Sequence, residues 1–203
     1  MKHPLHPRPS WITAVALASC LATTAFAQSQ DSKNAKPSPE ASVPSKKPDV
    51  IFVPTPQEVV EKMLELAKVK PGDILYDLGC GDGRIVVTAA KKFGVKAIGV
   101  DIDPERVKES LENVKANRVE HLVTIKQADI FELDFSDASV VTMYLLPSLN
   151  VRLMPKLAEL KPGTRIVSHD FDMRGAKPKQ VVQIETDERE VPVYLWVVPW
   201  EPE

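Results

Sequence analysis

A chain of 203 residues that is 43% hydrophobic and 27% charged has the composition of a globular protein, and it is long enough for one well-buried domain but hardly for two. Its formal net charge of -2 gives no basic field over the whole molecule. The composition therefore argues against a nucleic-acid partner.

The amino-terminal residues 1–27 have the pattern of an export signal. Lys2 and Arg8 give a basic start, residues 11–26 form an uncharged apolar run, and the small residues before Gln28 fit a signal-peptidase site. The run is short for a membrane span, which needs about 20 residues, and an uncleaved anchor stays open as an alternative. We therefore expect an exported protein, periplasmic or secreted, or one anchored in a membrane through residues 11–26.

Residues 28–49 contain four prolines and five serines and almost no apolar side chains. Such a segment cannot bury enough surface to offset its ordering entropy, so we expect a disordered linker, followed by one folded domain over residues 50–203. If Cys20 leaves with the signal, Cys80 is the one remaining cysteine and no intrachain disulfide can form. Cys80 lies between two glycines, and we interpret it as a small turn residue, not a nucleophile.

Helical and strand patterns alternate from residue 50 onward. The first helix, over residues 55–69, is predicted to have Thr55 as its N-cap, Pro56 at its first position and Glu58 completing a capping box. A later helix is opened by Asp103 and Pro104, and its predicted inner side carries Val107, Leu111 and Val114. We expect strands over residues 73–79, 96–102, 122–129, 139–146 and 164–170, and further helices over residues 84–94 and 147–160.

This alternation predicts a parallel sheet with helices on both faces and ligands at the carboxyl ends of the strands. The chain ends differently, because residues 179–185 and 191–199 are separated only by a short polar stretch, as in an antiparallel hairpin. The predicted fold is α/β: a Rossmann-like, doubly wound, mostly parallel seven-stranded sheet with a C-terminal antiparallel hairpin, in a single domain.

The stretch "DLGCGDGRI" brings three glycines together directly after the first strand. A dinucleotide-binding turn would need a glycine where Arg84 stands, and no Gly-Lys-Ser or Gly-Lys-Thr follows, as a P-loop requires. Asp82 also places a carboxylate where a pyrophosphate favours amides. We therefore expect a ligand with positive or zwitterionic character.

An aminoacyl sulfonium meets that requirement. Asp77 and the carbonyls of the turn can accept hydrogen bonds from its ammonium, while amides at the start of the next helix can bind its carboxylate. Asp101 ends the second strand, where an acid can bind ribose hydroxyls. Asp129 ends the third and can reach an adenine amino group, with Ile102 and Ile130 as apolar walls. Each acid alone could be a turn residue, but three at successive strand ends favour a cofactor site.

These motifs resemble those of the class I methyltransferases that use S-adenosylmethionine: "LYDLGCGDGRI" is similar to their first motif, "GVDIDP" to their second and "QADIFE" to their third. The stretches "FVPTPQEVVEKML" and "VVTMYLLPSLNVRLMPKL" resemble the small lysine methyltransferases of mitochondrial inner-membrane proteins, the ATP synthase c-subunit and adenine nucleotide translocase enzymes. The resemblance covers about residues 51–170.

The resemblance implies a role for each matching residue. It assigns Asp77, Gly79 and Gly81 to the methionine portion, Asp101 to the ribose, Asp129 to the adenine, and Pro54 and Thr55 to a segment that covers the cofactor near its methyl group. Asp101 stands where a glutamate is more common. The fourth strand ends in "YLLPS" and not in an Asn-Pro-Pro-Tyr motif, which argues against glutamine and nucleobase acceptors.

A lysine acceptor must be neutral to attack a methyl group, and an apolar channel lowers its pKa. Tyr144 at the end of strand four and Asp170 and Asp172 after strand five are candidates for lining such a channel. His169 is a weaker candidate and is interpreted as an incidental polar residue. The leading hypothesis is a monomeric protein-lysine methyltransferase that uses S-adenosylmethionine and no metal, with a membrane-associated protein substrate. Two alternatives stay open: a small-molecule methyltransferase, and an exported protein that binds the cofactor without transferring anything. Export conflicts with a cofactor made inside cells.

Overall fold

The computed structural model describes residues 51–203. The expected signal over residues 1–27 and the expected linker over residues 28–49 lie outside this part of the chain. Among the described residues, no helix has both the length and the apolar character needed to cross a membrane.

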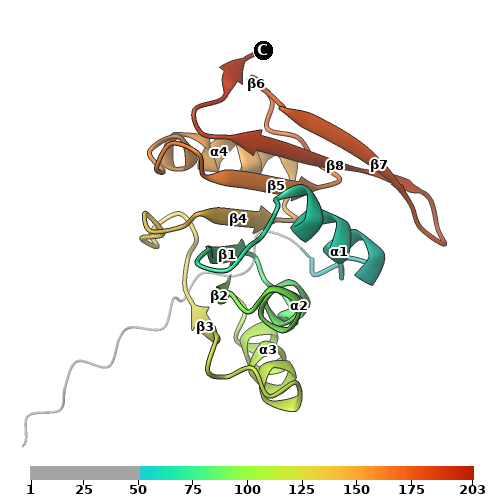
Figure 1. Ribbon diagram of the computed structural model, residues 1–203, viewed down its shortest axis with the longest axis vertical. Coiled ribbons are helices and arrows are strands. Elements are labelled where there is room, and N and C mark those ends of the chain that lie inside the picture. The colour runs from blue at the N-terminus through green and yellow to red at the C-terminus, as the bar shows by residue number, and fades with distance from the viewer. Residues whose placement is uncertain (1–50) are drawn as a thin grey trace, which may run out of the picture. The chain divides into compact units, whose positions relative to one another are not determined.

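The fold is the predicted one, a mostly parallel sheet of seven strands in the order β3-β2-β1-β4-β5-β8-β7 (Figure 1). The first five strands of that order are parallel, and β8 pairs antiparallel with both β5 and β7. The strands are β1 (Ile74–Leu78), β2 (Lys96–Asp101), β3 (Val123–Gln127), β4 (Val140–Met143), β5 (Arg165–His169), β7 (Gln180–Glu185) and β8 (Glu190–Val197). The two short strands β6 (Ala176–Lys177) and β9 (Glu201–Pro202) form a separate antiparallel pair that the sequence patterns do not predict.

Two apolar layers cover the two faces of the sheet. On one face, β-strand side chains pack with α1 (Gln57–Leu66), α2 (Arg84–Phe93) and α3 (Pro104–Ala116). The other face packs against α4 (Pro147–Ala158) and is filled by the fully buried Trp196 and Phe135. Because strand side chains alternate between faces, Leu75 belongs to the first layer and Tyr76 to the second.

The strand order reverses beside β1. The chain runs outward from β1 through β2 to β3, and then returns to place β4 and β5 on the other side of β1. In open α/β sheets such a reversal leaves a crevice at the carboxyl ends of the central strands. The glycine-rich turn after β1 therefore lies where a ligand is expected.

The predicted capping box at α1 is wrong. The helix begins at Gln57, Pro56 is its N-cap, and no side chain caps it. Thr55 lies one position too early to reach the free amides of the first turn. Its Oγ1 lies 3.3 Å from Nδ1 of His169 instead. The Thr55 hydroxyl therefore makes a tertiary contact with His169 in place of the predicted helix cap.

The predicted start of α3 is confirmed, because the Asp103 side chain accepts a hydrogen bond of 2.9 Å from the amide of Glu105, and Pro104 is the first helical residue. The predicted inner side of this helix is only partly right. Val114 is buried, but 51% of Leu111 is exposed, and Ser110 is fully buried in the layer beside the glycine-rich turn.

Asp103→Ala is expected to lower the free energy of unfolding by about 1 kcal/mol, because it removes the cap of α3. Asp103→Asn keeps an oxygen acceptor and is the matched control. Its free energy of unfolding should fall by only a few tenths of about 1 kcal/mol. Urea denaturation of the cofactor-free protein measures both. Equal losses for the two variants would show that Asp103 does not stabilise the helix by capping it.

Candidate active site

A cleft that is partly open to solvent lies at the carboxyl ends of β1, β2 and β4. Most of the residues that the sequence assigned to the cofactor line it, namely Thr55, Asp77, Gly79, Asp101, Ile102, Asp129 and Ile130, and so does Tyr144. Gly81 and Pro54 are not among the lining residues of this cleft, and neither is Asp170.

The glycine-rich turn holds the backbone in conformations that other residues rarely adopt. Gly79 has φ of +81° and Gly81 has φ of +55°. The amides of Gly79 and Cys80 both donate to the carbonyl of Val100, at 2.8 and 2.9 Å, which fastens the turn to the end of β2. A β-carbon at Gly81 would lie 2.1 Å from the ring of Phe52. The absence of a side chain at Gly81 thus lets the ring of Phe52, which lines the cleft, pack against the turn.

Cys80 takes no part in nucleophilic chemistry at this turn. The thiol is buried, and burial raises its pKa well above the usual value, so that it stays protonated. Its sulfur lies 3.6 Å from Oγ of Ser110, which in turn donates to the carbonyl of Gly81. The residue fills the base of the turn, in agreement with its interpretation from the sequence.

Asp77 is a buried acid at the end of β1, and only 2% of it is exposed. Thr142 donates a hydrogen bond of 2.8 Å to its Oδ1. Burial, followed by the charges of Asp101 and Asp82, raises the pKa of Asp77 to about 7. A carboxylate that is costly to ionise in this place is stabilised by a bound cation. The ammonium group of an aminoacyl ligand would supply one.

Asp101 is the second acid of the cleft and ends β2. Its Oδ2 accepts from the amide of Gly81 at 2.9 Å, and its Oδ1 accepts from the amide of Asp103 at 3.0 Å. Burial raises its pKa despite these hydrogen bonds. The two amides fix the carboxylate at the mouth of the glycine-rich turn, where its remaining lone pairs can accept hydrogen bonds from vicinal hydroxyls.

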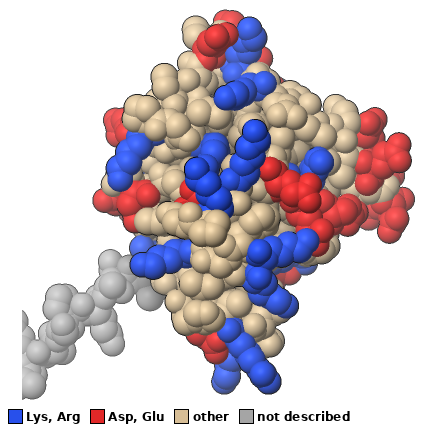
Figure 2. All heavy atoms as spheres, in the orientation of Figure 1, with Lys and Arg blue, Asp and Glu red and all other residues tan. Residues whose placement is uncertain are grey.

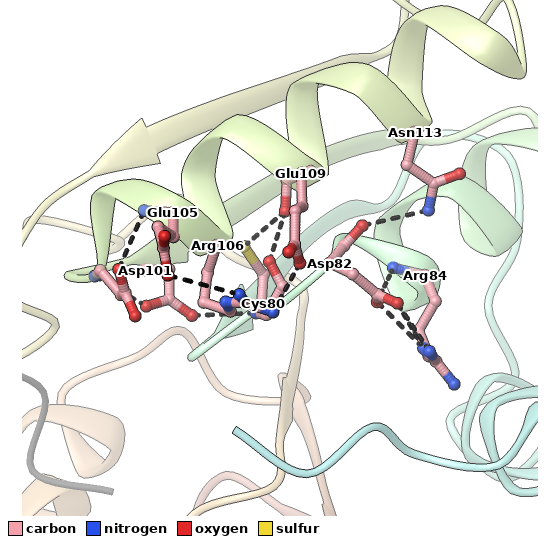
Figure 3. A network of polar contacts seen from close by, with 11 residues as sticks. Cys80, Asp82, Arg84, Asp101, Glu105, Arg106, Glu109 and Asn113 are labelled. Atoms are coloured by element: carbon pink, nitrogen blue, oxygen red, sulfur yellow. Dashed lines mark hydrogen bonds and ion pairs between the residues drawn. The ribbon is translucent and has the colours of Figure 1, made fainter. Parts of the chain in front are cut away.

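Asp82 lines the cleft and forms an ion pair with Arg84. Burial would raise its pKa, but the guanidinium of Arg84 outweighs that effect and holds the pKa below its usual value. Figure 3 shows Asp82 and Arg84 turned toward each other, and Asn113 reaching the same turn from α3. Arg84 also donates to the carbonyl of Thr55 at 2.8 Å. This pair joins the glycine-rich turn to the segment before α1.

Asp129 lies two residues beyond the end of β3, slightly later than predicted. Its Oδ1 accepts a hydrogen bond of 3.0 Å from the amide of Phe131 and holds the loop that forms one wall of the cleft. Ile102 and Ile130 line the same cleft. The arrangement places an acid between apolar walls, as an adenine-binding position requires.

Tyr144 lines the cleft and forms an aromatic cluster with His169, the last residue of β5. Their ring centroids are 4.0 Å apart, and Phe171 stacks on Tyr144 at 6.0 Å. His169 is only 2% exposed, and burial lowers its pKa to about 4, so the imidazole is neutral near pH 7. His169, a weaker candidate in the sequence analysis, is thus buried against Tyr144 and Thr55. Its position at the end of a predicted strand was the one signal that could have pointed to it.

Asp170 and Asp172 do not line this cleft. The carboxylate of Asp170 forms an ion pair with Arg189, including a hydrogen bond of 3.0 Å from Nη1 to Oδ1. Asp170 therefore holds the β7–β8 hairpin against the end of β5. Within residues 51–203, no group of three or more His, Cys, Asp or Glu side chains could hold a metal ion.

The family model of the ANTKMT methyltransferase domain matches residues 77–180, which contain most of this cleft. A protein-lysine N-methyltransferase of Saccharolobus islandicus (strain REY15A) is 54% identical over 153 residues, which are 74% of this chain and 95% of the relative. The chain belongs to this methyltransferase family.

Two further comparisons support the same conclusion about the methyltransferase. The adenine nucleotide translocase lysine N-methyltransferase of Mus musculus is 35% identical, over 68% of this chain and 60% of the relative. A crystal structure described as an RNA methyltransferase from Salinibacter ruber, in complex with S-adenosyl-L-homocysteine, is 51% identical. It covers 73% of this chain and 95% of its own, with a TM-score of 0.70. The enzyme is an S-adenosylmethionine-dependent methyltransferase.

Proposed function

We propose that this methyltransferase transfers methyl groups from S-adenosylmethionine to the Nζ atom of lysine side chains in a protein substrate. The observation that carries the proposal is the aromatic cluster formed by Tyr144, which lines the cofactor cleft, and the buried His169 that packs against it. The similarity to the protein-lysine N-methyltransferase of Saccharolobus islandicus supports the same acceptor.

The cluster suits a lysine because it lacks a net charge. A lysine ammonium that enters a buried aromatic site loses hydration, and its pKa falls toward the value at which the amine is neutral. The neutral nitrogen then forms a bond to the methyl carbon while the bond from that carbon to the sulfonium sulfur breaks. The product ammonium releases its proton to water. The protein contributes positioning and exclusion of solvent.

RNA is the second candidate acceptor, because the Salinibacter ruber structure is described as an RNA methyltransferase and is 51% identical to this chain. The formal net charge of -2 opposes it, since RNA-binding domains gather basic residues against the phosphates. We therefore place a protein acceptor first and make RNA an outcome of the test.

The test is incubation of the purified enzyme with isotope-labelled S-adenosylmethionine and, in parallel, a protein extract and total RNA. We expect label in protein, located by mass spectrometry on mono-, di- or trimethyllysine. Asp101→Ala is the matched control and, with cofactor below saturation, is expected to label the extract about 10- to 100-fold less. Label confined to RNA nucleosides or to small molecules would refute a protein-lysine acceptor.

The location of the enzyme and its substrate rests on the sequence. We propose export or anchoring through residues 1–27, supported by their basic start and apolar run, and a monomeric enzyme acting on a membrane-associated protein. Cell fractionation and sequencing of the mature amino terminus test export or anchoring, and light scattering tests the monomeric state. A full-length protein in the cytosolic fraction would contradict export or anchoring.

A further inference from the structure

A second cleft, partly open to solvent, adjoins the first one. Val53 and Tyr144 line both clefts, so the two spaces meet at the aromatic cluster. The segment before α1 and the tip of the β7–β8 hairpin form the opposite sides of the second cleft. A donor in the first cleft and an acceptor in the second would therefore meet at Tyr144.

Carboxylates dominate the rim of this second cleft. Glu58 contributes from α1, and Asp187 and Glu188 contribute from the hairpin tip. Arg189 also lines the cleft, but its guanidinium is paired with Asp170. Figure 2 shows acidic side chains gathered at the right-hand edge of the molecule, where Figure 1 places the tip of this hairpin. The rim therefore attracts cations.

The hairpin tip is held in place and presents its acids in a defined arrangement. Oγ1 of Thr186 accepts from the amide of Arg189 at 3.2 Å and donates to its carbonyl at 2.7 Å. The ion pair between Arg189 and Asp170 ties the same turn to the end of β5. Asp187 and Glu188 are thus carried on a turn that is fixed to the wall of the active site.

His169 gives an independent sign that this cleft takes a ligand. The imidazole lines the cleft and is 2% exposed. Its Nδ1 is occupied by Thr55, whereas its Nε2 has no hydrogen-bond partner among residues 51–203. A buried polar atom without a partner costs free energy, which a ligand with a donor group recovers.

We propose that the second cleft is the acceptor site and that it selects basic segments of the protein substrate. This inference rests on the proposed lysine specificity. The target lysine passes between Glu58 and the hairpin acids, and its amino group donates a hydrogen bond to Nε2 of His169 beside Tyr144. Asp187 and Glu188 favour substrates that carry further basic residues next to the target lysine. The hairpin is then the specificity element of the enzyme.

The first test removes the two hairpin charges with the double substitution Asp187→Asn and Glu188→Gln. The control is Glu112→Gln with Glu120→Gln, two exposed acids outside both clefts that change the net charge equally. The probe is a synthetic peptide of alternating lysine and serine. We expect KM for the peptide to rise about three- to tenfold in the hairpin variant only, with kcat and cofactor affinity unchanged, and the difference to shrink at high salt.

The second test replaces the imidazole by His169→Phe, which keeps an aromatic ring against Tyr144 but removes both nitrogens. We expect kcat/KM for the peptide to fall at least about tenfold while S-adenosylhomocysteine still binds, which shows that the fold is intact. Unchanged kinetics would overturn the role of Nε2. Since the hairpin acids are exposed, the first test stands even if this variant does not fold.

Fluorescence anisotropy of the labelled peptide, with S-adenosylhomocysteine bound, separates the two proposals. Hairpin-dependent binding without methylation would refute the lysine acceptor but keep the cleft as a cation-binding site. Lysine methylation with equal KM values for the two double variants would refute the second cleft as the element that selects basic substrates. It would leave lysine as the acceptor. An enzyme that neither binds nor methylates the peptide would refute both.

Discussion

Asp77→Asn is expected to stabilise the cofactor-free enzyme above neutral pH while weakening its binding of S-adenosylmethionine about tenfold or more. The asparagine keeps the shape of the side chain and can still accept the hydrogen bond from Thr142. It removes a buried negative charge that nothing balances until the ammonium of the cofactor arrives. A charge-assisted hydrogen bond to that ammonium accounts for the expected loss, about 1.5–3 kcal/mol.

The stabilising effect has a defined dependence on pH. Burial raises the pKa of Asp77 to about 7 in the folded enzyme, from an ordinary value of 3.8 in the unfolded chain. Between these values the folded state holds a proton that the unfolded state has lost, so stability falls as the pH rises through this window. The free energy of unfolding of the asparagine variant does not decrease in this way, because asparagine does not ionise. The variant's advantage should be about 1–2 kcal/mol near about pH 5 and on the order of 4 kcal/mol near about pH 8.

Urea denaturation at the two pH values and calorimetric titration with S-adenosylhomocysteine measure both effects. A single stability difference at both pH values would mean that Asp77 titrates normally. Undiminished cofactor affinity would mean that the ammonium binds elsewhere.

Asp101→Ala is expected to weaken cofactor binding about 10- to 100-fold, because it removes charge-assisted hydrogen bonds to the ribose hydroxyls worth about 1.5–3 kcal/mol. The same change leaves the amides of Gly81 and Asp103 without their acceptor and loosens the turn. Calorimetric titration with S-adenosylhomocysteine measures the affinity, and circular dichroism checks that the fold persists.

Asp101→Glu is the matched control, because it keeps a carboxylate at the end of β2. Its affinity should stay within about threefold of the wild type, well under the loss expected for a missing charge-assisted hydrogen bond. If alanine and glutamate weaken binding equally, the geometry of the turn matters and the carboxylate does not. If neither changes the affinity, the ribose does not bind at Asp101.

The sequence predicted the sheet and the acids of the cofactor cleft because both depend on local patterns. A strand of this sheet ends where its apolar run ends, so Asp77 and Asp101 could be placed at the carboxyl edge from the sequence alone. Successive parallel strands meet at one edge, which brought these acids together. The hairpin of β7 and β8 is predictable for the same reason, since only a short polar stretch separates its strands.

The remaining features depend on contacts between distant segments, which no local pattern records. The hydroxyl of Thr55 contacts His169, 114 residues away in the chain, and does not cap the helix as predicted. Asp82 lines the cleft and is also paired with Arg84, which reaches the segment before α1, and the sequence does not predict this link. The second cleft is built by residues near 55 and near 188, and its existence depends on β8 lying between β5 and β7.

A crystal structure of the enzyme with S-adenosylhomocysteine tests most directly whether the acids at the strand ends bind the adenosyl cofactor. We expect the amino group of the ligand at Asp77 beside the glycine-rich turn, the ribose hydroxyls on Asp101, and the sulfur facing Tyr144, where the second cleft begins. A ligand bound with its ribose away from Asp101, or with its sulfur turned away from Tyr144, would contradict this expectation.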